Sequence, residues 1–69
     1  MNKLNEIQNF ILFCLESYRT KTNKAGKEAL NDFKKYDVFN FLEEGFEVLH
    51  TQSKSYTIDE IITFIKNQK

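Results

Sequence analysis

Hydrophobic side chains recur along this chain with the spacing of helices, and four segments show the pattern. In the first, residues 4–20, apolar residues follow one another at steps of three and four, which places them on one side of a helix: Leu4, Ile7, Ile11, Cys14 and Tyr18. Four further residues extend this stripe around most of the helix: Phe10, Leu12, Phe13 and Leu15. A helix that is apolar on most sides is buried on most sides. We therefore expect residues 4–20 to be the central element of the fold, or to contact a second chain.

Two shorter patterns follow. Residues 24–36 have a narrow apolar face, and Asn23 is the candidate N-cap. Gly26 in the first turn lowers helix propensity, which indicates close packing at that point. Residues 38–50 form the third pattern, with Asp37 as candidate N-cap. Gly45 inside it costs about 1 kcal/mol relative to alanine, so either a ring, Phe10 or Phe13, passes close to the backbone or the helix bends there.

The fourth pattern, residues 58–67, begins at a strong local signal. Thr57 and Glu60 have the spacing of a capping box. In this motif the side chain of each residue accepts a hydrogen bond from the backbone amide of the other. Tyr56 and Ile61 have the spacing of a hydrophobic staple around it. The sequence therefore predicts an all-α fold: one compact four-helix domain over residues 1–69, with short connecting loops.

The length of the chain makes such a domain marginal. A domain of 69 residues buries only about 60% of the surface that its unfolded chain exposes. One cysteine excludes an internal disulfide, and no Cys/His spacing suits a structural zinc. The remaining stabilisation comes from oligomerisation or a bound partner. A free thiol, the lack of an apolar run near ~20 residues and the lack of a signal-peptide layout predict a cytoplasmic protein without a membrane span.

Charge balances over the whole chain but not along it. Ten Lys and Arg residues match ten Asp and Glu residues. Residues 19–35 (the basic segment) carry six basic and two acidic residues, a net charge of +4, and residues 37–47 (the acidic segment) carry four acidic residues and no basic one. Either the two segments neutralise each other across neighbouring helices, or they form a polarised surface that steers a charged partner.

The junction between the third and fourth patterns concentrates hydrogen-bonding groups. It holds His50, the one histidine, followed by Thr51, Gln52 and, a few residues later, Tyr56. His50 falls where a ring nitrogen can meet terminal helix carbonyls, so a cap, a partner contact and a general base are alternative roles. Catalysis would also need an orienting carboxylate and a nucleophile in reach.

Other catalytic or ligand-binding signals are weak. Cys14 lies in the apolar stripe, which predicts an inert core thiol. The chain has no glycine-rich phosphate loop and too few ligand residues for a metal site, so we expect no cofactor, no metal and no enzymatic activity. The basic segment is conceivable as a DNA-reading helix, but Glu28 and Asp32 interrupt its face, which makes nucleic acid an unlikely partner.

Several short stretches together carry a family resemblance. They are Phe13–Arg19, Gly26–Glu28, Phe33–Val38 with Phe41–Leu42, Leu49–Gln52, Tyr56 and Glu60–Ile61. In order and spacing they resemble a family of short bacterial helical proteins classed as a domain of unknown function, over residues 10–65. The chain departs from that pattern at Ser53, where the family has glycine, and at Ala25, where it has a serine-type cap.

The resemblance implies a direction for function. Members of that family are often encoded beside proteins with an ADP-ribosyltransferase-like fold, as in toxin–antitoxin or phage-defence systems. It implies a non-enzymatic protein-interaction module, an antitoxin-like or accessory partner of a toxin-like enzyme. We place the contact surface at the polar junction and the acidic face, on His50, Thr51, Gln52, Tyr56, Glu43, Glu44 and Glu47. The alternative is a small homo-oligomeric regulator with weak DNA binding through residues 19–35.

Overall fold

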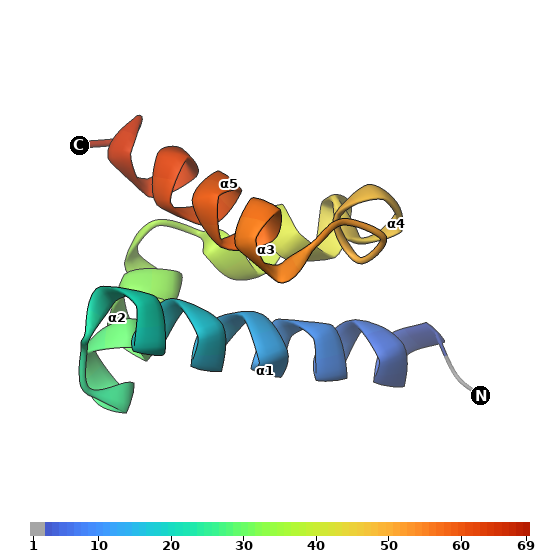
Figure 1. The fold of residues 1–69 in the computed structure, drawn as a ribbon, viewed down its shortest axis with the longest axis horizontal. Coiled ribbons are helices and arrows are strands. Elements are labelled where there is room, and N and C mark those ends of the chain that lie inside the picture. The colour runs from blue at the N-terminus through green and yellow to red at the C-terminus, as the bar shows by residue number, and fades with distance from the viewer. Residues whose placement is uncertain (1–2) are drawn as a thin grey trace.

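The computed structural model describes residues 3–69 and places them in five helices. These are α1 (Lys3–Thr22), α2 (Gly26–Lys35), α3 (Val38–Glu44), α4 (Phe46–Leu49) and α5 (Lys54–Lys66). No strand occurs among the described residues, so the all-α prediction is confirmed. In Figure 1, α1 forms one layer, α3 and α5 lie above it, and α2 joins the layers at one end. None of these helices combines the length and apolar character that crossing a bilayer requires.

The core is built around the ring of Phe33, which is fully buried. Its neighbours are the rings of Tyr18 from α1 and Phe39 from α3, with centroids 5.4 and 5.6 Å away. Each helix except α4 supplies side chains with no exposed surface: Cys14, Ala29, Phe33, Val38, Leu42 and Ile61. Burying a large aliphatic or aromatic side chain completely stabilises a fold by roughly 1.5–3 kcal/mol, so these contacts hold the two layers together.

The expectation that α1 is buried on most sides is wrong within this chain. It does contact α2, α3 and α5, but these helices cover only one of its faces. Cys14 and Tyr18 lie on the covered face, whereas Leu12 is 60% exposed and Phe13 is 48% exposed. The chain has too few other residues to enclose a twenty-residue helix.

The third predicted helix is divided at Gly45, where α3 ends and α4 begins. The close approach of Phe10 or Phe13 that the sequence suggested is not the cause. A Cβ added to Gly45 would lie 2.9 Å from Leu49 Cδ1 and 3.1 Å from the Phe41 carbonyl oxygen. The glycine is therefore required by its own turn, which agrees with the alternative of a local bend.

The start of α5 corrects the predicted capping box. The helix begins four residues early, at Lys54, and the hydroxyl of Ser53 accepts a hydrogen bond from the Tyr56 amide at 3.1 Å. Thr57 lies inside the helix, 2% exposed, and its hydroxyl donates to the Leu49 carbonyl at 3.2 Å. Because Ser53 already caps the helix, Thr57 is free to join α5 to α4 through a buried hydrogen bond.

The predicted cap of α2 is wrong, whereas Asp37 is the N-cap residue of α3 as predicted. Ala25, not Asn23, precedes α2, and Asp37 precedes α3 but makes no capping hydrogen bond with its side chain. Asn23 and Asp37 instead adopt left-handed backbone conformations, with φ of 55° and 57°. Asparagine and aspartate tolerate this region better than other non-glycine residues, so both residues turn the chain between helices.

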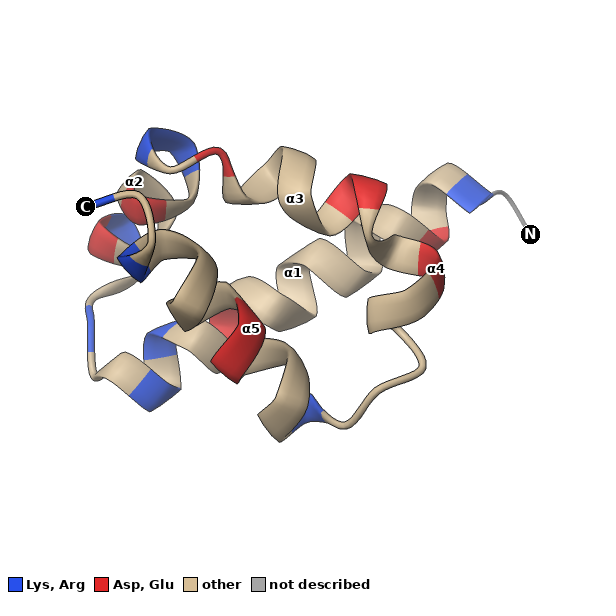
Figure 2. Ribbon diagram, turned by 90° about the horizontal axis from the view of Figure 1, so that it is seen from above, with Lys and Arg blue, Asp and Glu red and all other residues tan. Residues whose placement is uncertain are grey.

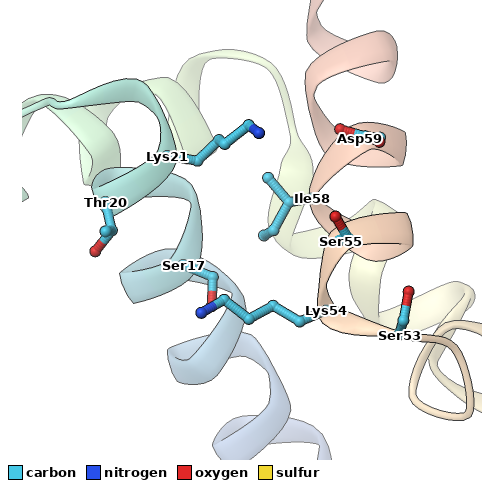
Figure 3. A pocket seen from close by; sticks show the side chains of 8 residues that line it. All are labelled: Ser17, Thr20, Lys21, Ser53, Lys54, Ser55, Ile58 and Asp59. Atoms are coloured by element: carbon cyan, nitrogen blue, oxygen red, sulfur yellow. The ribbon is translucent and has the colours of Figure 1, made fainter.

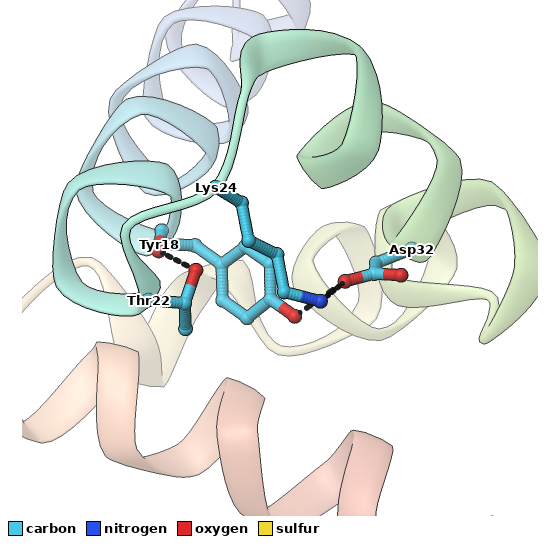
Figure 4. A network of polar contacts seen from close by, with 4 residues as sticks. All are labelled: Tyr18, Thr22, Lys24 and Asp32. Carbon is cyan, nitrogen blue, oxygen red and sulfur yellow. Dashed lines mark hydrogen bonds and ion pairs between the residues drawn. The ribbon is translucent and has the colours of Figure 1, made fainter.

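A polar network fastens α1 to α2 at the end of the molecule (Figure 4). The Tyr18 hydroxyl donates to Asp32 Oδ2 at 2.7 Å, and Lys24 Nζ lies 2.5 Å from the same oxygen. Burial, together with the bond to Asp32, raises the pKa of Tyr18 to about 12. Burial would raise the pKa of Asp32, but the bonds from Lys24 and Tyr18 outweigh it and hold that pKa below its usual value.

Replacing Tyr18 by phenylalanine tests this network. We expect Tyr18→Phe to lower the free energy of unfolding by about 1 kcal/mol, the net value of one hydrogen bond. The pKa of Tyr18 is raised from 10.0 to about 12, so its stabilisation is complete below pH 10 and is lost as the pH rises through 12. The lowered pKa of Asp32 affects stability at acidic pH. The stabilisation from its carboxylate is present above the unfolded pKa of 3.8 and is lost as the pH falls through the lower pKa of the folded state.

Urea unfolding followed over a pH series measures both effects. The difference in stability between wild type and Tyr18→Phe should shrink between pH 10 and about 12. Tyr36→Phe removes a phenol outside the network and serves as the matched control, which should keep the wild-type profile. An unchanged alkaline profile in Tyr18→Phe would contradict the role of the network.

The two glycines are expected to respond oppositely to alanine. At Gly26 an added Cβ meets nothing closer than Arg19 Nε at 3.6 Å, an ordinary contact, so the close packing predicted there is absent. Gly26→Ala should therefore stabilise the fold by roughly 0.5–1 kcal/mol. Gly45→Ala should destabilise it by about 1–3 kcal/mol, because Leu49 and the α3 backbone must move. Thermal unfolding of both variants measures the difference, and stabilisation by Gly45→Ala would refute the crowding at that turn.

Candidate functional site

Residues from α1, α4 and the start of α5 line an open groove with a volume of about 460 Å³. We call it the aromatic groove, and its lining consists of Glu6, Asn9, Phe10, Phe13, Phe46, His50, Gln52 and Thr57. Two of the predicted contact residues, His50 and Gln52, therefore face a wall of α1 that no sequence motif singled out. The one signal for that wall is the excess of apolar residues around α1.

Stacked rings cross the groove from α1 to the end of α4. The ring of Phe10 meets the edge of Phe46 with a centroid distance of 5.5 Å, and Phe46 stacks on the imidazole of His50 at 4.3 Å and 10°. Phe46 is buried, whereas nearly half of the Phe13 side chain is exposed beside this stack. The groove thus has a fixed aromatic floor and one accessible ring on its rim.

His50 takes the capping role that its position at a helix end predicted. It is the C-cap of α4, and its Nδ1 lies 2.6 Å from the Phe46 carbonyl oxygen. Because a carbonyl only accepts hydrogen bonds, Nδ1 carries the proton in this contact. The Nε2 atom makes no hydrogen bond within residues 3–69. The partner of Nδ1 is therefore a backbone carbonyl and not the carboxylate that we looked for beside a catalytic histidine. The Nε2 atom remains available to an external group.

Two other residues of the predicted junction lie outside the groove. The Thr51 hydroxyl donates to the Val48 carbonyl at 2.7 Å, a local turn contact. Tyr56 is exposed on the first turn of α5, and the Glu60 carboxylate beside it raises the pKa of its phenol. The polar junction is therefore not one cluster: part of it faces the groove and part lies on the flanking surface.

The acidic face lies on α3 and α4, next to the groove rather than in it. Glu43, Glu44 and Glu47 are all exposed. Glu44 accepts a hydrogen bond from Asn40 Nδ2 at 3.2 Å, and Glu47 forms an ion pair with Lys3 that lowers the pKa of its carboxyl. These residues leave a negative surface at this end of the molecule.

The basic and acidic segments do not neutralise each other. Within residues 3–69 the ion pairs are Lys3–Glu47, Arg19–Glu16 and Lys24–Asp32, and none joins the two segments. Figure 2 shows most Lys and Arg residues toward the α2 end and a run of acidic residues on α3 and α4 toward the opposite end. Of the two interpretations, this arrangement favours the polarised surface.

Cys14 is buried in the core. It has no exposed surface, and burial raises the pKa of its thiol to about 12, so its predicted place in the core is confirmed, and its lack of reactivity stays a prediction. Among the described residues, no three side chains of the His, Cys, Asp or Glu types are grouped so that they could hold a metal ion.

Replacing His50 by alanine tests how much its side chain contributes to stability. We expect His50→Ala to lower the free energy of unfolding by about 1 kcal/mol, because a hydrogen bond and a stacked ring are lost. Gln52→Ala, two residues away on an exposed side chain, should change it by less than about 0.5 kcal/mol. Urea unfolding measures both, and equal stability of His50→Ala and wild type would remove the capping role.

A comparison with protein families places the chain. The family model described as Protein of unknown function (DUF3791) matches residues 9–68, and the chain belongs to this family. No curated protein and no solved structure shows significant similarity to it. The resemblance to a domain of unknown function is thereby confirmed, whereas the association with ADP-ribosyltransferase-like neighbours stays a prediction.

Proposed function

We propose that this DUF3791 member is a protein-interaction module without catalytic activity of its own, and that the aromatic groove is its contact surface. The observation that supports this most is the accessible Phe13 ring beside the Phe10–Phe46–His50 stack. Aromatic anchors in a partly formed pocket with a polar rim are typical of the residues that carry binding energy in protein interfaces.

The incomplete cover of α1 supports the same proposal. Leu12, Phe13 and Val48 remain between 48% and 62% exposed in a chain of only 69 residues. A domain this small gains little from its core alone, and a large apolar side chain left open to water gains free energy when a partner covers it. A partner that covers them would provide burial that the chain itself lacks.

For the partner, we propose a toxin-like enzyme with an ADP-ribosyltransferase-like fold, which this chain accompanies as an antitoxin-like or accessory protein. This step rests on the sequence resemblance. The acidic face beside the groove adds a chemical requirement, because Glu43, Glu44 and Glu47 favour a basic surface on the partner. In this arrangement His50 Nε2 and Gln52 supply directional contacts on the rim, and Thr51 and Tyr56 flank it.

Affinity capture of the tagged chain from its native host tests the proposal, with mass-spectrometric identification and stoichiometry from light scattering. We expect one stoichiometric protein partner. Phe13→Asn should weaken its binding by a factor of roughly thirty, as for a truncated hot-spot residue of about 2 kcal/mol. Leu30→Asn is the matched control: Leu30 is an exposed apolar residue on α2 and does not line the groove.

Three outcomes would count against the proposal. Equal losses in both variants would place the contact outside the groove. Recovery of self-associated chain alone would favour the homo-oligomeric regulator. Recovery with nucleic acid would favour DNA binding through residues 19–35, and a retardation assay would then show the steep salt dependence of phosphate contacts.

A further inference from the structure

The aromatic groove differs in charge from three other hollows on the described surface. One of these opens between the last turns of α1 and the first turns of α5, and it is lined by Lys21 from α1 and Lys54 from α5 (Figure 3). The linings of the other two also include lysines: Lys24, Lys27, Lys34, Lys66 and Lys69. The lining of the aromatic groove contains no lysine and no arginine. A cation that enters it therefore meets no ammonium or guanidinium group.

Two carboxylates lie at the end of the groove where α1 begins. Glu6 lines the groove, is exposed and forms no ion pair within residues 3–69. Glu47, on α4, forms an ion pair with Lys3. Hydrogen bonding to Glu47 and, more weakly, the charge of Glu6 raise the pKa of the Lys3 ammonium. Carboxylates from two helices therefore act on one cation at this end, and that of Glu6 still lacks a partner of its own.

The polar groups of the groove offer several hydrogen-bond acceptors. The Nδ1 proton of His50 is directed at the Phe46 carbonyl oxygen, 2.6 Å away, so Nε2 of the neutral imidazole presents a lone pair. Asn9 and Gln52 are exposed and line the groove, and each has an amide oxygen beside its NH₂ donors. With the Glu6 carboxylate, these acceptors suit an occupant that carries several N–H groups.

An accessible ring lies on the same face of α1 as the unpaired carboxylate. Glu6, Phe10 and Phe13 follow one another at steps of four and three, which places them on one side of the helix. Helical side chains lean toward the N-terminus of their helix, and this brings the half-exposed Phe13 ring nearer to Glu6. The face of an aromatic ring attracts cations, and arginine uses such contacts more often than lysine.

We propose that the aromatic groove binds an arginine side chain of the partner protein. The guanidinium group pairs with the Glu6 carboxylate, and the apolar stem packs against the exposed ring of Phe13. Lysine fits this site less well, because its ammonium is a strongly hydrated point charge that does not stack on a ring. The inference rests on the proposed function, since it specifies the residue with which a protein partner enters the groove.

Amide chemical shifts, followed by NMR while the full chain is titrated with peptides, test the arginine site. The probe is acetyl-Gly-Ser-Arg-Ser-Gly-amide, and the comparison peptides carry lysine or the neutral citrulline in place of arginine. We expect saturable shifts of amides in residues 6–13 and 50–52, with roughly threefold weaker binding of the lysine peptide and roughly tenfold weaker binding of the citrulline peptide. Glu6→Gln should weaken binding of the arginine peptide roughly tenfold, as for one hydrogen bond to a charged group. Phe13→Leu, which keeps an apolar side chain but removes the ring, should weaken it roughly threefold.

The matched control is Glu28→Gln, which removes the same charge from an exposed position on α2 outside the groove and should bind the arginine peptide as wild type does. Equal affinity for the three peptides, equal weakening by Glu6→Gln and Glu28→Gln, or no saturable shift in the groove would each overturn the arginine site.

Affinity capture of the native partner separates that failure from a failure of the proposed function. If Phe13→Asn weakens capture and Glu6→Gln does not, the groove remains the contact surface and arginine is not its occupant. If neither variant weakens capture, both proposals fail. Weakening by both variants, with Glu28→Gln at the wild-type level, is the expected result.

Discussion

The packing of one face of α1 against α2, α3 and α5 is the contact on which the rest of the structure depends. The helices α2, α3 and α4 have ten, seven and four residues, and isolated helices shorter than ~12–15 residues are marginal in water. They persist because Phe33, Val38 and Leu42 are removed from water against α1 and α5. Because α2, α3 and α5 all pack on this one face, no helix is left to cover the other sides of α1, which remain accessible.

Helical periodicity predicted much of this fold because it is a local property. The stripe of α1, the face of α2 and the start of α3 follow from spacing alone. The start of α5 does not, because Ser53 and Thr57 are both good caps and the choice depends on the Leu49 carbonyl, which offers Thr57 another partner. The crowding at Gly45 likewise depends on the Leu49 rotamer, which no pattern of residue types encodes.

The candidate site divides in the same way. His50 and Gln52 could be chosen from the sequence because the junction between α4 and α5 is a local feature. The facing wall, from Glu6 to Phe13, is some forty residues away along the chain, and only tertiary packing brings it there.

The groove has a further consequence for the lifetime of the protein. Its two walls, residues 6–13 and 46–57, come together only in the folded chain, so any molecule held between them adds its binding free energy to the free energy of unfolding. Proteases act on the opened chain, whose population falls by the same factor. An occupied groove would therefore slow degradation, and the cellular amount of this small chain would follow the amount of the molecule that fills it.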